Sequence, residues 1–259
     1  MDEQTIAAAA RHILAERTAG ARLAPFAPGT GPIDEPAGYA VQRAVHRLGD
    51  EPLAGYKIGC TTPVMQRFLG IDAPAAGGMV ERGRLASACT LHHRDFRRVG
   101  FEGEIAVTLG ADLAAGPFDR TRVADAVGSC HVAIEVVDDR YTDFAAVGVP
   151  TLIADDFFHA GFVLGPAVAD WRSLDLAAAE GAMRIDGEVI ERGRGEAVMG
   201  HPLAALAWLA DLLVAQSRPL RAGATVLLGS LVTTRWLTGE HEVAFAVEGL
   251  GAVSLHLRD

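Results

Sequence analysis

Two glutamates two positions apart, Glu102 and Glu104, are the strongest sign of chemistry in the sequence. They lie in Phe101–Leu109, where apolar residues alternate with polar or small ones, a pattern typical of a β-strand with one buried face. A spacing of two places both carboxylates on the same face of that strand. Adjacent carboxylates repel each other unless a cation or a proton lies between them. The alternative interpretation is a solvent-facing strand whose acids are simply hydrated.

A third acid, Glu135, interrupts the otherwise apolar segment Val132–Val137. An unpaired carboxylate would be costly to bury there, so the residue needs a partner. One interpretation is an ion pair with Arg140 or His131. The other is a metal site shared with the two glutamates of the preceding strand. Three carboxylates from two strands suit Mg²⁺ or Mn²⁺ better than zinc and leave coordination positions open for water and a chelating substrate.

Lys57 is the next candidate, because it lies in the apolar, glycine-flanked segment Gly55–Thr61. A lysine held away from water there could be tuned to donate or accept a proton. The alternative is a lysine at a strand end, whose stem packs against the protein while its ammonium reaches water.

The elements that must position these residues begin with a helical section. The sequence predicts a helix over Ile6–Glu16 that ends at Gly20, and a second helix that starts at Pro36. A short third helix is expected to begin after Thr62 as N-cap, with Pro63 at its first position, and to stop at Gly70.

Strands dominate from about residue 100 onward. The sequence predicts few further helices, mainly Asp119–Gly128 and the segment from His201-Pro202 to Ala215, and a hairpin around Asp186-Gly187. This order favours an α+β fold over a regular alternation of strands and helices. We expect a helical N-terminal section over 1–75 and a β-rich catalytic body over 76–259, joined as one continuous unit. The other strands are expected near His131–Val137, Phe162–Leu164, Thr225–Leu231, Val243–Val247 and Ala252–Leu257.

Composition excludes several classes of protein. The formal net charge of −10 over 259 residues argues against a nucleic-acid partner and against a polybasic membrane contact. The longest uncharged apolar run, Ala197–Ala210, is too short for a membrane span and contains His201-Pro202. Three widely spaced cysteines form no CxxC pair, and the N-terminus carries acidic residues. We therefore expect a cytoplasmic protein without disulfides.

Taken in order, these segments resemble the 2-keto-4-pentenoate hydratase branch of the fumarylacetoacetate hydrolase superfamily. The resemblance covers nearly the whole chain, and an ordered set of motifs is far more specific than any one of them. The segments that carry it are Gly55–Thr61, Gln66, Leu69-Gly70, Phe101–Val107, Ala133–Arg140, Ala154–Asp156, Gly193–Gly195, Gly200–Leu203, Trp208-Leu209, Gly229-Ser230 and Gly249–Gly251.

The resemblance implies a mixed β-roll body, a homo-oligomer and a divalent metal, Mg²⁺ or Mn²⁺. The metal ligands fall on Glu102, Glu104 and Glu135, and a proton-shuttling lysine falls on Lys57. The implied reaction adds water to a 2-hydroxy-2,4-dienoate, which gives a 4-hydroxy-2-oxo acid in aromatic-ring degradation.

Further roles follow from the same resemblance. Thr61, Gln66 and Ser230 are the expected substrate-binding residues. Relatives usually carry acids after the lysine motif, whereas here the nearest downstream acid is Glu81, which we expect to act with Asp155 in catalysis. Asp155 could equally be a helix cap or a loop anchor.

Three alternative functions stay open at this point. The same scaffold could decarboxylate a 4-oxalocrotonate-type acid, which needs no base to activate water, or hydrolyse a C–C bond of an acylpyruvate. A non-catalytic partner subunit is the alternative from a different class, and the intact lysine and acids argue against it.

Overall fold

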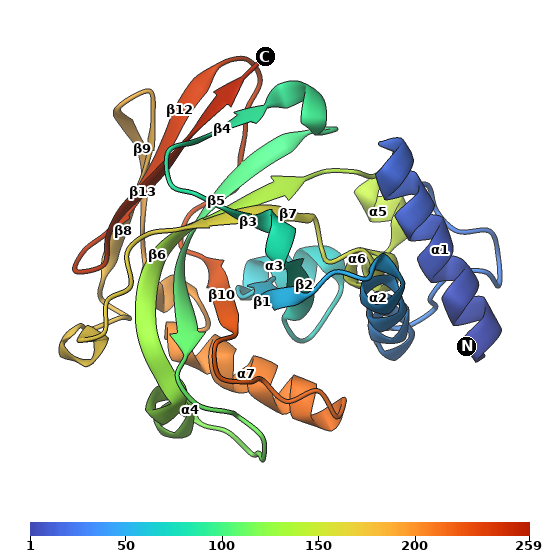
Figure 1. Ribbon diagram of the computed structural model, residues 1–259, viewed down its shortest axis with the longest axis horizontal. Helices are drawn as coiled ribbons and strands as arrows, with labels where there is room; N and C mark the ends of the chain where they lie inside the picture. The colour runs from blue at the N-terminus through green and yellow to red at the C-terminus, as the bar shows by residue number, and fades with distance from the viewer.

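Two sheets and an end group of helices make up the protein, and a computed structural model describes all residues, 1–259. The larger, eight-stranded sheet has the order β2-β1-β10-β5-β6-β7-β3, with β11 paired to β5 off this path. The smaller, five-stranded sheet has the order β4-β13-β12-β8-β9. In Figure 1 the long strands β5 and β6 run between the smaller sheet on one side and the helices α1, α2 and α6 on the other.

Most strand pairs are antiparallel, and three pairs, β1 with β10, β3 with β7 and β4 with β13, are parallel. Two of the strands, β5 and β6, are much longer than the rest and pair over nearly their whole length. The strands are β1 Leu53–Gly59, β2 Ala75–Val80, β3 Arg84–Leu85, β4 Cys89–His92, β5 Val99–Leu109, β6 Val127–Asp138, β7 His159–Leu164, β8 Glu180–Ile185, β9 Glu188–Arg194, β10 Thr225–Ser230, β11 Arg235–Trp236, β12 His241–Val247 and β13 Gly251–Arg258.

Side-chain N-caps mark where six of the seven α-helices begin, and α6 has none. Asp2, Asp34, Thr62 and Asp119 each accept a hydrogen bond from a first-turn backbone N–H, which satisfies one of the donors that a helix start leaves free. The helices are α1 Glu3–Ala19, α2 Glu35–Gly49, α3 Pro63–Leu69, α4 Arg120–Ala126, α5 Phe144–Val147, α6 Val149–Ala154 and α7 Pro202–Ala215.

The expected α+β architecture is confirmed, and so are most of the expected elements. The helix predicted from Thr62 and Pro63 to Gly70 is α3, and Gly70 ends it in the left-handed conformation. The predicted hairpin at Asp186-Gly187 joins β8 to β9. The apolar face of β5 packs in the main core as expected, with Phe101, Ile105 and Val107 fully buried.

The N-terminal section shares the larger sheet with the body. Besides α1, α2 and α3 it contains β1, a strand that the sequence analysis had not assigned. This strand pairs with β2 on one side and β10 on the other, inside the larger sheet. Residue 75 therefore marks the start of β2 inside the larger sheet.

One stretch, Gly195–Ala215, is long and apolar enough to cross a membrane by composition alone. It includes α7, whose Leu206, Leu209 and Ala210 are fully buried. Half of its most apolar window is buried inside the protein, as in the core helix of a globular fold. Its apolar character is therefore explained by packing against the protein interior.

Candidate metal centre

Glu102 on β5 and Glu135 on β6 lie directly opposite each other across the antiparallel pair. Glu104, two residues further along β5, lies opposite Ala133 and points to the same face. One carboxylate oxygen from each of the three glutamates lies within 4.8 Å of the other two. The register of two long strands thus brings together the three acids that the sequence proposed as metal ligands.

The three carboxylates are withdrawn from solvent to different degrees and are only partly hydrogen-bonded. Glu104 and Glu135 are fully buried, and Glu102 is half-buried. Glu102 Oε1 accepts a hydrogen bond from Thr234 Oγ1, and Glu104 Oε2 accepts one from the Gly229 N–H at 2.7 Å. The second oxygens of Glu104 and Glu135, Oε1 and Oε2, are buried with no hydrogen-bond partner in the protein. Buried oxygens of this kind are what a metal ion needs as ligands.

Gly229 at the end of β10 holds one of these ligands and has to be glycine. Its φ of 117° lies in the region that side chains rarely adopt, and a Cβ there would come within 2.6 Å of the Thr61 side chain. Only glycine lets the β10 backbone approach Thr61 while its N–H donates to Glu104.

Lys57, the single lysine of the chain, is buried beside these acids. Its Nζ lies 3.3 Å from Glu135 Oε1, and its side chain is 4% exposed. Burial alone would lower the pKa of Lys57, but the charge of Glu135, followed by those of Glu102 and Glu104, raises it above the usual value. The interpretation of a lysine withheld from water is therefore the correct one.

The acids themselves carry excess negative charge. Burial, and next the charge of Glu135, raise the pKa values of Glu102 and Glu104 above the usual range. Burial also acts to raise the pKa of Glu135, yet Lys57 and His159 lower it overall. Once the ammonium of Lys57 has offset one carboxylate, the remaining charge equals in size that of a divalent cation.

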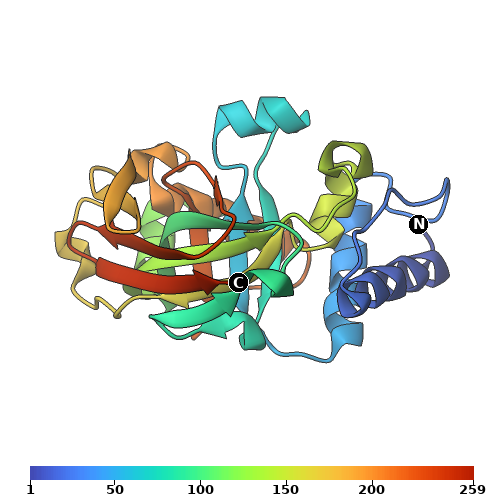
Figure 2. The same cartoon turned by 90° about the horizontal axis from the view of Figure 1, so that it is seen from above.

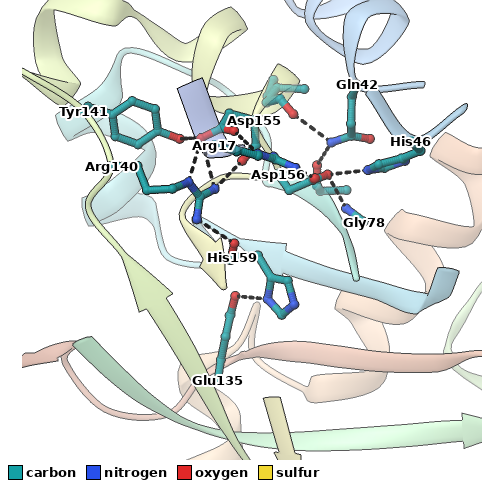
Figure 3. A network of polar contacts seen from close by, with 12 residues as sticks. Arg17, Gln42, His46, Gly78, Glu135, Arg140, Tyr141, Asp155, Asp156 and His159 are labelled. Atoms are coloured by element: carbon teal, nitrogen blue, oxygen red, sulfur yellow. Dashed lines mark hydrogen bonds and ion pairs between the residues drawn. The ribbon is translucent and has the colours of Figure 1, made fainter. Parts of the chain in front are cut away.

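His159, at the start of β7, is a partner that the sequence analysis missed. Its Nδ1 lies 2.8 Å from Glu135 Oε1, its side chain is 4% exposed, and its Nε2 has no partner. Figure 3 shows this histidine between Glu135 and the guanidinium of Arg140, which donates to the His159 carbonyl. The only sequence signal was a histidine after two phenylalanines at the start of an apolar strand.

The alternative interpretation of Glu135, an ion pair with Arg140 or His131, is wrong for both partners. Arg140 donates to Asp155 instead, and the His131 ring lies against Thr108 and the Gly165 carbonyl. The groups that do contact Glu135, Lys57 and His159, belong to other strands, so spacing along the chain could not identify them.

A cavity of about 570 Å³ opens beside the acids and is lined by Lys57 and Glu102 at the metal centre. Thr61 and Ser230, two of the three expected substrate-binding residues, also line it. Gln66 does not, because its side-chain amide donates to the Cys60 carbonyl and ties α3 to the end of β1. The rest of the wall is mostly apolar.

Two residues expected in catalysis are not brought to this cavity. Glu81 lies exposed on a short 3₁₀ turn, and its carboxylate accepts a hydrogen bond from Arg84 at 2.7 Å. The acids that line the cavity besides Glu102 are Asp139 and Glu191. A role for Glu81 in activating water therefore has no support from this geometry.

Asp155 ends α6 inside a network of ion pairs, shown in Figure 3. Its carboxylate accepts hydrogen bonds from Arg17 at 2.6 Å, from Arg140 at 3.0 Å and from the Tyr141 hydroxyl at 3.0 Å. The arrangement matches the loop-anchor interpretation of this residue. Its connection to the metal centre runs through Arg140 and His159.

Known proteins resemble this chain over most of its length. Residues 82–258 match the family model described as fumarylacetoacetate (FAA) hydrolase C-terminal. A 2-keto-4-pentenoate hydratase of Burkholderia vietnamiensis is 33% identical over 255 residues, which cover 97% of each chain. A 2-hydroxyhexa-2,4-dienoate hydratase of Comamonas testosteroni is 32% identical over 81% of this chain and 80% of its own.

Among solved structures, a 4-oxalocrotonate decarboxylase from Pseudomonas putida G7, complexed with magnesium and adipate, has the same fold. The TM-score is 0.90 at 23% identity, covering 99% of this chain and 98% of that one. The match to the family model spans more than half of the sequence, and the hydratase relatives extend the similarity to its full length. The chain therefore belongs to the fumarylacetoacetate hydrolase family.

Proposed function

We propose that this protein is a divalent-metal-dependent hydratase that adds water to a 2-hydroxy-2,4-dienoate and releases a 4-hydroxy-2-oxo acid. The observation that carries the proposal is the convergence of three carboxylates and the only lysine beside a cavity that Lys57 and Glu102 line. Relatives named 2-keto-4-pentenoate hydratase, at 33% identity over nearly the whole chain, support the same reaction.

The residues fit a bound Mg²⁺ or Mn²⁺. Glu102, Glu104 and Glu135 offer only oxygen ligands, two of them with unpartnered buried atoms, which suits a hard cation. Such an ion would supply Lewis acidity to the carboxylate and 2-oxygen of the substrate. His159 and the Gly229 N–H would orient two of the ligands.

Lys57 is the residue in place to move a proton. In the overall change the 2-hydroxyl loses its proton and a terminal carbon gains one, which turns the dienol into a conjugated ketone. Water then adds its hydroxyl to carbon 4 and a proton to carbon 3. Lys57, held as an ammonium by Glu135, can donate a hydrogen bond to the substrate oxygen and exchange the proton that the first step relocates.

The runner-up is decarboxylation of a 4-oxalocrotonate-type acid on the same scaffold. A Pseudomonas putida relative with that name is 27% identical over 83% of this chain. The acids of the cavity other than Glu102, which are Asp139 and Glu191, are paired with Arg98 and Arg235 and are not free to activate water. Acylpyruvate hydrolysis would also use the metal and the lysine, but it has no observation in its favour beyond the shared site.

Turnover separates these activities. Enzymatically generated 2-hydroxypenta-2,4-dienoate and 4-oxalocrotonate should be offered in parallel, with and without Mg²⁺, while products are followed by ultraviolet absorbance and mass. The proposal predicts 4-hydroxy-2-oxopentanoate from the first acid and metal-dependent rates. Release of CO₂ from 4-oxalocrotonate without hydration of the dienoate would assign the decarboxylase activity instead.

We also propose that the protein is a cytoplasmic homo-oligomer that acts on a small acid and binds neither nucleic acid nor membrane. The net charge of −10 and the family resemblance support this. Light scattering after size exclusion should give a mass well above 27.2 kDa. A monomer mass at micromolar concentration would contradict the oligomer.

A further inference from the structure

We infer that the outer part of the cavity is a subsite for an apolar substrate tail, so that the preferred acid carries an alkyl or aryl group at the end remote from its carboxylate. This inference rests on the proposed function, because the metal centre must hold the acid head. It concerns the apolar wall of the cavity, because the proposed chemistry gives that wall no role.

A continuous row of aromatic rings leads away from the lysine. Lys57 Nζ lies 5.5 Å from the centre of the Phe157 ring, and Phe157 lies edge-to-face on Phe158 at 5.9 Å. Phe158 lies 5.9 Å from Phe144, which lies 6.2 Å from Phe68. All four rings line the cavity. A chain whose head contacts Lys57 therefore has an aromatic surface along its whole further length.

The row runs from the protein interior to solvent. Phe157 is buried, Phe158 and Phe144 are half-buried, and Phe68 is 64% exposed. Phe68 belongs to α3, which also exposes Val64 at 65% and Met65 at 43%. Figure 2 shows this short helix, in cyan, standing off the body of the protein. An exposed apolar helix face that continues a buried aromatic wall marks a place where an apolar group binds.

The backbone at this wall is strained. Asp156, Phe157 and Phe158 have φ values of 56°, 51° and 69°, three consecutive residues in the left-handed region that bulky side chains rarely adopt. Ion pairs of Asp156 with Arg17 and His46 hold the first of them in place. Strain of this kind persists at sites where the surroundings impose it, and here it directs two phenylalanines to the cavity.

Each cation that lines the cavity already has an acidic neighbour. The only positively charged residues of the cavity are Lys57, which faces Glu135, and Arg98. Arg98, whose side chain is 52% exposed, lies 3.5 Å from Asp139 and stacks on Trp236 at 4.6 Å, so its charge is shared between a carboxylate and solvent. An apolar tail consequently fits this wall better than the distal carboxylate of a dicarboxylic acid, which would lose its hydration without gaining an unpaired cation.

The test uses 2-oxo acids whose chelating heads are identical and whose tails differ. Binding to the Mn²⁺-loaded full-length protein is measured by calorimetry for pyruvate, 2-oxobutanoate, 2-oxohexanoate and 2-oxoadipate. We expect affinity to rise about three- to fourfold for each added methylene, with a negative heat-capacity change. 2-Oxohexanoate should bind at least tenfold more tightly than 2-oxoadipate, which has the same length and a terminal carboxylate.

Two substitutions test whether the gain in affinity with tail length comes from the aromatic row. Phe68→Ser, on the exposed end of the row, should lower affinity for 2-oxododecanoate, whose longer tail can extend along the row, about threefold more than affinity for pyruvate. Ile33→Ser, which removes an equally exposed apolar side chain (77%) outside this cavity, should change neither. Since both positions are exposed, neither substitution threatens the fold.

The outcomes separate this inference from the proposed function. Equal affinity for all monocarboxylates, or tighter binding of 2-oxoadipate that is lost in Arg98→Gln, overturns the apolar subsite and leaves the metal-dependent head site intact. Failure of every acid, pyruvate included, to bind the metal-loaded protein overturns both.

Discussion

Two clusters of buried carboxylates lie on either side of His159, and they are neutralised in opposite ways. At one, Asp155 and Asp156 face Arg17, Arg140 and His46, and hydrogen-bond donors reach oxygens of both acids (Figure 3). At the other, Glu102, Glu104 and Glu135 face one another with one ammonium among them.

The difference separates a structural cluster from a functional one. Arginine, histidine and tyrosine complete the first cluster without help, and it anchors α1 and α2 to the end of α6. In the second, two buried oxygens have no partner, and burial together with repulsion raises the pKa values of two of the acids. Such excess charge is tolerated where a ligand completes the site.

Metal removal should have the largest effect on activity, because the glutamate cluster depends on a cation and the aspartate cluster does not. Protein treated with EDTA should lose turnover, and should lose stabilisation by oxalate or pyruvate in a thermal shift assay. Added Mg²⁺ or Mn²⁺ should restore both. Equal stabilisation of the metal-free protein by oxalate would show that the cation is not the substrate's anchor.

Lys57→Met comes next. Removing the proton carrier should lower kcat by about 10²–10⁴ while metal affinity and fold persist, since the change leaves all three ligands in place. Steady-state kinetics and metal titration measure the two quantities.

Cys60→Ser is the matched control for that variant, because Cys60 lines the same cavity. Burial raises the pKa of its thiol to about 12, so the group stays protonated and should not take part in proton transfer near neutral pH. Near-normal rates in Lys57→Met, or a comparable loss in Cys60→Ser, would remove the special role of the lysine.

Asp155→Asn tests the first cluster. It leaves Arg17 and Arg140 without their main anionic partner, and we expect a loss of about 3 kcal/mol in the free energy of unfolding, measured by urea denaturation. Asp112→Asn, which breaks an exposed pair with Arg221, should have no measurable effect. A large loss of kcat in Asp155→Asn at unchanged stability would instead support a catalytic role for Asp155.

Acid should weaken the same cluster. Burial alone would raise the pKa of Asp156, but His46, Arg17 and the Gly78 N–H hold it well below the usual range. The stabilisation is therefore complete above the ordinary aspartate pKa of about 3.9 and is lost as pH falls towards the folded-state value. In Asp156→Asn, the free energy of unfolding measured by urea denaturation should fall less steeply below about pH 4. An unchanged dependence on pH in this range would show that protonation of Asp156 is not the cause.

Glu104→Gln should have the smallest effect and the opposite sign. In metal-free protein it removes repulsion among the three acids and keeps an oxygen for the Gly229 N–H, so stability should rise by about 1 kcal/mol. With Mg²⁺ present the same variant should be the less stable one, because it lacks a ligand. Destabilisation without metal would show that this cluster, too, is complete by itself.

Local patterns in the sequence determined much of this protein. Alternation in Phe101–Leu109 predicted a strand with two acids on one face, and Thr62, Pro63 and Gly70 predicted the limits of α3. These features depend on side-chain periodicity and capping within a few residues, so the chain carries them without reference to distant parts.

The tertiary structure alone decided which groups meet. Register between β5 and β6 placed Glu102 opposite Glu135, and pairing of β1 with β10 buried Lys57 beside them. The choice of Lys57 and His159 as partners of Glu135, the removal of Glu81 to an exposed turn and the row of aromatic rings all depend on contacts between distant segments. Spacing along a chain cannot specify such contacts, because strand order and register are fixed by the packing of the whole core.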